Sequence, residues 1–137
     1  MLVIGADYSF NPTNTDLHEQ VMNITEGRGF DIVIECSGAA SAVEPAFNFV
    51  ARGGTLIIAS AYKKDFKFPL DMAQVFSKEM TIKGVFLSPN LFDRSVRMLN
   101  RINFKETITA EFLLSQYQEA FKAHKSGKHI KIVFRID

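Results

Sequence analysis

Residues 31–38 read Asp-Ile-Val-Ile-Glu-Cys-Ser-Gly, and residues 54–59 read Gly-Thr-Leu-Ile-Ile-Ala. Both contain a short apolar run without polar alternation, which is typical of strands that are covered on both faces. A helix-length segment that closes on the pair Gly53-Gly54 separates the two runs. Together they predict a strand-helix-strand unit of a parallel sheet, and ligands of such sheets bind where the strands end.

Small residues follow both predicted strands: Cys36-Ser37-Gly38 after the first and Ala59-Ser60-Ala61 after the second. Small side chains let a flat ligand lie against the backbone, so this end of the sheet has the character of a nucleotide-binding edge. A dinucleotide-binding domain should also open with a strand, a glycine-rich turn and a helix. That opening is missing, because the nearest string, residues 27–32, lacks the third glycine and precedes a strand. We interpret this string as a helix-ending turn.

The composition is that of one globular domain. The chain has 137 residues, 47% of them hydrophobic and 23% charged, and its 16 basic and 15 acidic residues give a formal charge of +1. A basic stripe with interleaved aromatic residues is missing, which argues against a nucleic-acid partner. We expect a cytoplasmic protein without a membrane partner, because the sequence contains neither a bilayer-length apolar run nor a signal sequence. The single Cys36 excludes an intramolecular disulfide.

The remaining segments alternate between expected helices and strands. Near the start we expect a last helical turn over residues 2–5, a strand over 8–11, a helix from residue 17 to Gly27, and a helix over 39–52 that admits Pro45 only near its first turn. Further on we expect helices over 70–78, 88–102 and 114–125, and strands over 81–86, 107–110 and 130–136. No repeat or second-domain linker interrupts the series.

In this order the segments resemble the nucleotide-binding half of the medium-chain, zinc-type alcohol dehydrogenase family, which includes polyol and threonine dehydrogenases. The resemblance extends over essentially the whole chain. Its strings are Gly5-Ala6-Asp7 before a short segment ending in Asn11-Pro12, residues 31–38, Gly53-Gly54 before a strand, Lys83-Gly84 before Val85-Phe86, and Gly-Lys-His-Ile-Lys at 127–131. The resemblance implies an α/β fold over residues 1–137, a Rossmann-like parallel sheet with helices on both faces, truncated at the N-terminus.

The resemblance also implies where NAD or NADP would lie. Segment 36–38 would border the adenosine, while segments 59–61 and 85–87 would flank the nicotinamide. Lys131 matches a position where the family places a basic residue near the pyrophosphate, and a cation there complements the phosphate charge. The expected cofactor-binding residues are Cys36, Ser37, Gly38, Ala59, Ser60, Ala61, Val85, Phe86, Leu87 and Lys131.

By the same resemblance, the chain is part of an oxidoreductase that moves hydride from a secondary alcohol to nicotinamide, with zinc held by a catalytic domain missing from this sequence. The glycine-rich turn and the acidic residue that selects NAD or NADP are missing too, so we expect the chain to be inactive and to bind NAD weakly or not at all. We assign no catalytic or metal-binding residue, since Cys36, Glu35 and the scattered histidines lack the partners that such roles need. A stand-alone nucleotide-binding or assembly module without catalysis is the alternative, and within the enzymes so is a zinc-free quinone reductase.

The missing opening also predicts self-association. Without the opening strands and helices, a strand edge and apolar faces would be uncovered, and such surfaces drive association. In the family, the strand that matches residues 81–86 lies near the edge where two subunits join their sheets. The resemblance therefore implies a homodimer, or a higher homo-oligomer, formed through this strand.

Overall fold

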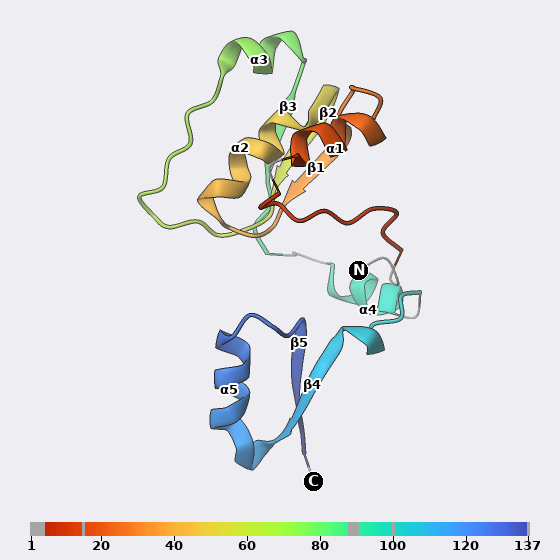
Figure 1. Ribbon diagram of the computed structural model, residues 1–137, viewed down its shortest axis with the longest axis vertical. Coiled ribbons are helices and arrows are strands. Elements are labelled where there is room, and N and C mark those ends of the chain that lie inside the picture. The colour runs from red at the N-terminus through yellow and green to blue at the C-terminus, as the bar shows by residue number, and fades with distance from the viewer. Residues whose placement is uncertain (1–4, 15, 88–90, 100, 137) are drawn as a thin grey trace. The chain divides into compact units, whose positions relative to one another are not determined.

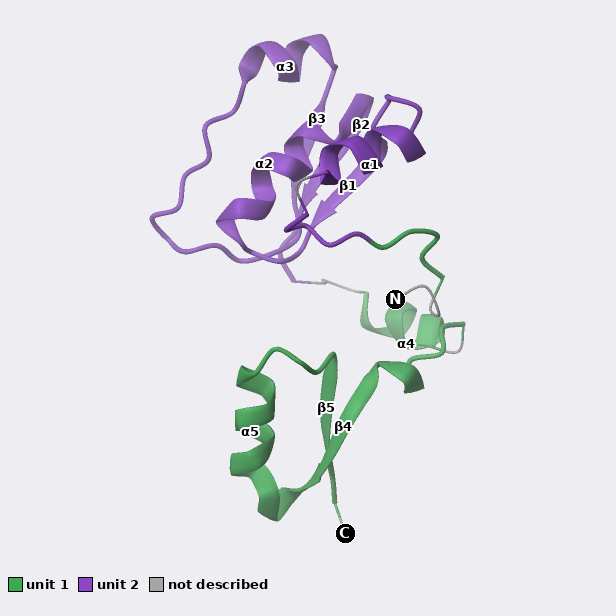
Figure 2. Ribbon diagram, in the orientation of Figure 1, with its two compact units in different colours: residues 1–9, 90–137 green, residues 10–89 purple. Residues whose placement is uncertain are grey.

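The computed structural model describes residues 5–14, 16–87, 91–99 and 101–136 (Figure 1). The chain divides into two compact units (Figure 2): a larger unit of residues 10–89 and a smaller unit of residues 1–9 and 90–137. Each unit has a parallel sheet of its own, with three strands in the larger unit and two in the smaller.

The larger unit is a series of strand-helix-strand crossovers. Its strands β1 (Phe30–Glu35), β2 (Val50–Ile58) and β3 (Thr81–Gly84) are parallel and lie in the order β1-β2-β3. Helix α1 (Leu17–Ile24) precedes β1, α2 (Ala40–Asn48) connects β1 to β2, and α3 (Met72–Ser77) lies between β2 and β3. Parallel neighbours require such crossovers. The parallel α/β fold expected from the two apolar runs is therefore confirmed.

The core of the larger unit lies between α2 and one face of the sheet. Phe47 of α2 packs with Val50 and Leu56 of β2, and all three side chains are buried. Val33 of β1, which pairs with Leu56, packs against this cluster, as does Phe68, whose ring meets Phe47 edge-on at a centroid distance of 6.0 Å. Burying a side chain of this size contributes roughly 1.5–3 kcal/mol, so this face organises the unit.

On β1 the alternate residues are exposed. Ile32 and Ile34 are 61% and 59% exposed, whereas Val33 between them packs against the core. Successive side chains of a strand point to opposite faces, so the two isoleucines belong to the face away from α2. An uncovered apolar surface of this kind is the feature from which the sequence predicts association.

The pair Gly53-Gly54 lies inside β2, which corrects the expectation of a helix over 39–52. Helix α2 ends at Asn48 and β2 begins at Val50. The β1–β2 register shifts after its first residue pair, so the glycines belong to an irregularity of the strand. Gly53 has a φ of +70°. Glycine inside a strand commonly marks such a bulge, and the sequence pattern alone does not separate a bulge from a helix end.

Two local expectations are wrong. Pro45 lies inside α2 and not in its first turn. No strand forms over the described residues 8–11, where the side chain of Asn11 instead accepts hydrogen bonds from the backbone N–H of Thr13 at 3.0 Å and from its hydroxyl at 2.8 Å. Asparagine competes with extended structure by making turns of this kind.

The helix boundaries follow from local chemistry. Helix α1 ends in a turn in which the N–H of Gly27 donates to the carbonyl of Met22 at 2.8 Å, which confirms that residues 27–32 open with a helix-ending turn. Helix α3 begins after Asp71, whose carboxylate accepts the N–H groups of Ala73 and Gln74 at 2.9 and 3.1 Å. The helical turn expected at 2–5 and the helix start expected at 88–90 lie largely outside the described residues.

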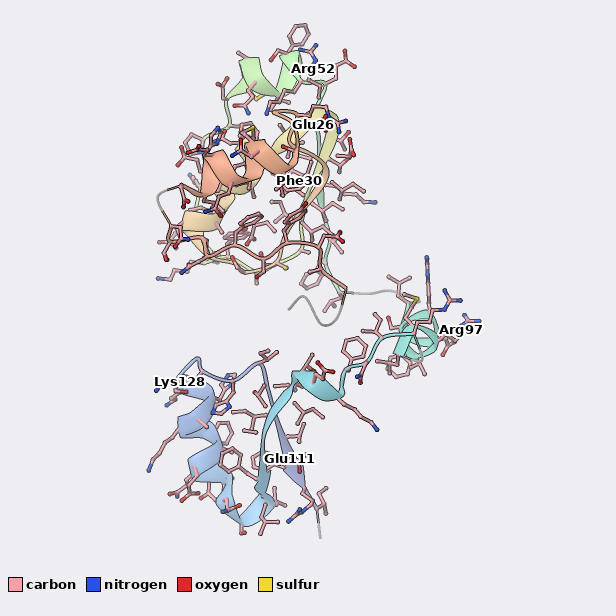
Figure 3. The ribbon with its side chains drawn as sticks, turned by 45° about the vertical axis from the view of Figure 1, so that its right-hand side comes forward. Glu26, Phe30, Arg52, Arg97, Glu111 and Lys128 are labelled. Atoms are coloured by element: carbon pink, nitrogen blue, oxygen red, sulfur yellow. The ribbon has the colours of Figure 1, made fainter. Side chains whose placement is uncertain are left out.

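The smaller unit contains β4 (Ile108–Leu113) and β5 (Lys131–Arg135), joined by the short η3 (Leu114–Gln116) and α5 (Tyr117–Lys125). Helix α4 (Phe92–Leu99) and η2 (Lys105–Thr107) precede β4. Figure 3 labels Glu111 on β4 and Lys128 after α5. Ala120 of α5 is buried, while Phe121 beside it in the sequence is exposed. The expected final helix and strand are confirmed, with a much smaller core than in the larger unit.

Candidate functional site

Three segments of the sequence meet at the carboxyl end of the larger sheet. The N–H of Ala59 donates to the carbonyl of Glu35 at 2.8 Å, and the N–H of Val85 donates to the carbonyl of Ile58 at 2.9 Å. The hydrogen-bonded ladder thus continues one residue beyond β2 and β3. Because the strands are parallel, their carboxyl ends share one edge. The structure brings together Cys36, Ser37, Gly38, Ala59, Ser60, Ala61, Val85, Phe86 and Leu87 at that edge.

The first two segments are in direct contact at Gly38. Gly38 has a φ of +69°, and a Cβ placed on it would lie 2.6 Å from the carbonyl oxygen of Ala61. A real Cβ does not approach backbone this closely, so glycine is needed both for its conformation and for this contact. The backbone of Gly38 therefore lies directly against Ser60 and Ala61.

A buried carboxylate links the same two segments. Glu35, the last residue of β1, is 4% exposed. Its Oε1 accepts hydrogen bonds from the backbone N–H and the hydroxyl of Ser37 at 2.8 and 2.5 Å, and from the N–H of Gly38 at 3.3 Å. Its Oε2 accepts from the hydroxyl of Ser60 at 2.5 Å and from the hydroxyl of Tyr62. One side chain of β1 thus gathers donors from two loops.

These hydrogen bonds keep Glu35 ionised. Burial alone would raise the pKa of the carboxyl, but the hydrogen bonds from Ser37, Ser60 and Tyr62 outweigh burial and lower the pKa from 4.5 to about 2. The pKa of the Tyr62 hydroxyl is raised, by burial and by its hydrogen bond to Glu35. At neutral pH the edge therefore carries a negative charge, which the hydrogen bonds from Ser37, Ser60 and Tyr62 stabilise.

The third segment is the most open part of the edge. Phe86 is 85% exposed, and Leu87 follows with a φ of +55°, an uncommon conformation for a residue other than glycine. Such backbone strain often occurs at ligand-binding sites. Cys36, at the end of β1, is an exposed free thiol.

Lys131 belongs to the smaller unit. It begins β5, where it pairs with Ile108 of β4, and its carbonyl accepts a hydrogen bond from the Thr109 hydroxyl at 3.4 Å. Its assignment to the cofactor stays a prediction.

At the opposite, amino end of the same strands lies the charged side chain of Lys78. The Lys78 ammonium donates to the carbonyl oxygens of Asn48 and Val50 at 3.1 and 2.8 Å, and burial lowers its pKa. Figure 3 labels Phe30 and Arg52 on the first two strands of this unit. A cavity of about 560 Å³ at this end is lined by His18, Met22, Gly27, Arg28, Asp31, Asn48, Ala51, Arg52 and Lys78. It contains none of the residues that the sequence predicts for the cofactor.

The described residues include no group of three or more His, Cys, Asp or Glu residues that could hold a metal ion. None of their helices is long and apolar enough to span a membrane.

The sequence reasoning missed Tyr62 and undervalued Glu35. A glutamate that ends an apolar strand is a signal of a buried and therefore hydrogen-bonded carboxylate, since an unpaired one would be too costly. Its hydrogen bonds to Ser37 and Gly38 could be predicted from the sequence, because these residues are only two and three positions away. Those to Ser60 and Tyr62 could not, because they come from residues 25 and 27 positions further along the chain.

Comparison with known proteins agrees with this architecture. The family model for zinc-binding dehydrogenases matches residues 1–103. The chain is 30% identical to sorbitol dehydrogenase from Rattus norvegicus and 32% identical to L-threonine 3-dehydrogenase from Pyrococcus horikoshii, over 98% and 97% of its own length. It spans only 38% and 39% of the length of those relatives. A solved zinc-binding dehydrogenase structure from Clostridium scindens matches with a TM-score of 0.88 and 30% identity, over 96% of this chain and 37% of that chain.

Proposed function

We propose, because the chain belongs to the zinc-binding dehydrogenase family, that residues 1–137 form part of the dinucleotide-binding domain of an NAD(P)-dependent alcohol or polyol dehydrogenase. The observation that carries the proposal is the meeting of three strand-end segments, two of them made of small residues, at one sheet edge. Nucleotides bind at the carboxyl edge of open parallel sheets of this kind. Solved structures with the same fold hold NADP and NADH.

The residues of this chain would bind and orient the dinucleotide. Segment 36–38 would border the adenosine, because Gly38 lets the backbone approach closely. Segments 59–61 and 85–87 would flank the nicotinamide and hold its carboxamide through backbone groups. Lys131 would complement the pyrophosphate. A nicotinamide bound here would supply the acceptor for the hydride of a secondary alcohol. We assign no zinc ligand within residues 1–137.

A titration of the purified chain with NAD, NADH, NADP and NADPH tests this proposal. Calorimetry, or the fluorescence of the reduced forms, would report saturable binding, weak in the absence of a glycine-rich turn. Lys131→Ala should weaken that binding several-fold, because it removes a charge that would face the phosphates. Lys128→Ala is the matched control, since it removes a lysine three positions earlier in the same unit and should change little. A folded chain that binds none of the four would contradict cofactor binding by residues 1–137 alone, and would leave their function to a longer enzyme or to an assembly module.

Self-association is a second part of the proposal. In the sheet order β1-β2-β3, strand β3 pairs with β2 alone among the described strands, and all four of its residues are exposed. An unpaired strand edge is a template for pairing with another chain. We expect a homodimer in sedimentation velocity and a shift to monomer on Ile82→Lys, with Met72→Lys on α3 as the control. A monomer at high concentration would contradict this part.

The cellular location is the third part of the proposal. A cytoplasmic protein, as expected from the sequence, should be recovered in the cytoplasmic fraction of cells that express it. Recovery in another fraction would contradict that expectation.

A further inference from the structure

We infer that Glu35 is a positioning residue of the proposed nucleotide-binding edge, and that its carboxylate holds segments 36–38 and 60–62 in the arrangement in which a dinucleotide binds. The identity of the ligand rests on the proposed function, whereas the arrangement of the two loops is observed in the structure. In this role Glu35 would not contact the substrate or a reacting atom. It would act through the two loops that it joins.

The hydrogen bonds divide cleanly between the two loops. All three donors to Oε1 come from Ser37 and Gly38, at 2.5 to 3.3 Å. Both donors to Oε2 are hydroxyls of the second loop, from Ser60 at 2.5 Å and from Tyr62. The carboxylate therefore bridges the loops, one oxygen to each, and neither loop can move without losing its set of hydrogen bonds.

The number of donors excludes an acid–base role for Glu35. A carboxylate offers about four lone-pair sites, and five donors already address them. At 4% exposure it also has almost no contact with solvent. A general base needs a free acceptor within reach of the substrate proton, and this group has none to offer. What the carboxylate can do is orient its donors.

The orientation of the donors matters because the two loops are closely packed at Gly38 and Ala61. The site that a Cβ of Gly38 would occupy is only 2.6 Å from the Ala61 carbonyl oxygen, so a shift of less than an ångström would alter the surface on which a flat ligand lies. The hydroxyl of Ser37 is fixed further by the N–H of Ala39, which donates to it at 3.1 Å. The ring of Tyr62 stacks on Phe66 at 5.2 Å, which extends the ordered surface into the following loop. A misplacement of about 1 Å can slow an enzyme reaction about 100-fold, so displacements of this size matter at a site that orients a cofactor.

The negative charge is needed as well as the shape. Glutamine has nearly the same size, but its amide has one acceptor oxygen and a donor NH₂ group. In Glu35→Gln the NH₂ group could donate to the hydroxyl oxygens of Ser60 and Tyr62 but could not accept from the N–H groups of the first loop. In either orientation one acceptor oxygen is lost, and the remaining hydrogen bonds lose their charged acceptor, which weakens them.

The experiment compares Glu35→Gln with two controls in the same chain. Glu44→Gln makes the same chemical change at an exposed position of α2, and Lys78→Met destabilises the opposite end of the same sheet. Two quantities are measured for each protein: the dissociation constant for NADH, and the amide hydrogen-exchange rates of Ser37 and Gly38. We expect Glu35→Gln to weaken NADH binding about 10-fold or more and to speed both exchange rates by a similar factor, since the lost hydrogen bonds are to a charged group.

The controls separate positioning from a general loss of stability. Lys78→Met should change NADH binding and the two exchange rates less than about twofold after correction for global unfolding. Glu44→Gln should change neither. Tyr62→Phe, which removes one hydroxyl and keeps the aromatic ring, should weaken binding by a smaller factor than Glu35→Gln.

The outcomes distinguish failure of the positioning role of Glu35 from failure of cofactor binding. If the native chain binds NADH and Glu35→Gln binds it equally well, the positioning role is wrong while the proposed function stands. If the native chain does not bind NADH, cofactor binding by residues 1–137 alone is wrong, and the exchange rates then decide whether Glu35 holds the loops. Equal exchange at Ser37 and Gly38 in Glu35→Gln and Lys78→Met would overturn the inference.

Discussion

The two ends of the three-stranded sheet are each held by one charged side chain, of opposite sign. At the carboxyl end, Glu35 accepts hydrogen bonds from the N–H groups and hydroxyls of two loops. At the amino end, Lys78 donates to the carbonyls of Asn48 and Val50, where α2 ends and β2 begins. The signs match the backbone, because a helix that runs antiparallel to its strands brings carbonyls to the amino end of the sheet.

The difference between the ends lies in what the charges hold. Lys78 binds the carbonyls of Asn48 and Val50, which lie at the end of α2 and the start of β2. The regular structure on either side already constrains this connection. Glu35 binds loop N–H groups and side-chain hydroxyls that have no regular structure to constrain them. Both side chains contribute hydrogen bonds to the fold, but only Glu35 also sets the shape of a surface that loops form.

Acid should act on the carboxyl end more strongly than any single substitution. The folded pKa of Glu35 is about 2 against an ordinary 4.5, so its stabilisation is complete above the ordinary pKa and is lost as the pH falls toward 2. A shift of this size corresponds to roughly 3 kcal/mol of unfolding free energy at 1.36 kcal/mol per pKa unit. Urea unfolding at pH values from 6 to 2.5 should show this loss, and Glu35→Gln should remove most of the slope. The same slope in both proteins would contradict the assignment.

Gly38→Ala should destabilise the carboxyl end by about 2 kcal/mol. The substitution places a side chain in the left-handed region, which costs about 1 kcal/mol, and adds a clash with the Ala61 carbonyl. Gly53→Ala is the matched control, because Gly53 has nearly the same φ, +70° against +69°, with nothing within 4 Å of its Cβ position. It should lose only about 1 kcal/mol. Thermal unfolding measures both, and equal losses would show that the contact between the two loops is unimportant.

Lys78→Met should have the smallest effect, a loss of about 1 kcal/mol at pH 7. It removes two hydrogen bonds from a charged donor, but it also relieves the burial that lowers the Lys78 pKa. Because that pKa is lowered, the charged form is disfavoured in the fold, and the native chain should become more stable as the pH rises toward 10.5. Lys78→Met should lack this rise in urea unfolding. A variant more stable than the native chain at pH 7 would mean that burial outweighs the two hydrogen bonds.

Much of the fold could be predicted from the sequence because its strongest patterns are local. The apolar runs that became β1 and β2 and the cap at Asp71 are each contained in a few consecutive residues. The errors came where one local pattern fits two structures. Gly53-Gly54 fits a helix end and a strand bulge equally well, and Tyr8 to Phe10 are strand-forming residues over which the structure assigns no strand.

For the candidate site, the sequence could name the three segments but not the way they are joined. Parallel strands place their carboxyl ends together, so finding the strands was enough to predict that residues 36–38, 59–61 and 85–87 meet. No local signal connects Glu35 to Tyr62, 27 positions away. Their pairing depends on the crossover through α2, which sets the register of β1 against β2.

By itself, the sequence determined the class of fold, the family resemblance and the edge at which a ligand would bind, because these depend on residue type and spacing along the chain. Only the tertiary structure decided that a buried carboxylate joins two loops at that edge and that an ammonium closes the opposite end. Those interactions depend on distances between segments far apart in sequence. Such distances are set by packing of the core around Phe47 and Leu56, which no run of consecutive residues contains.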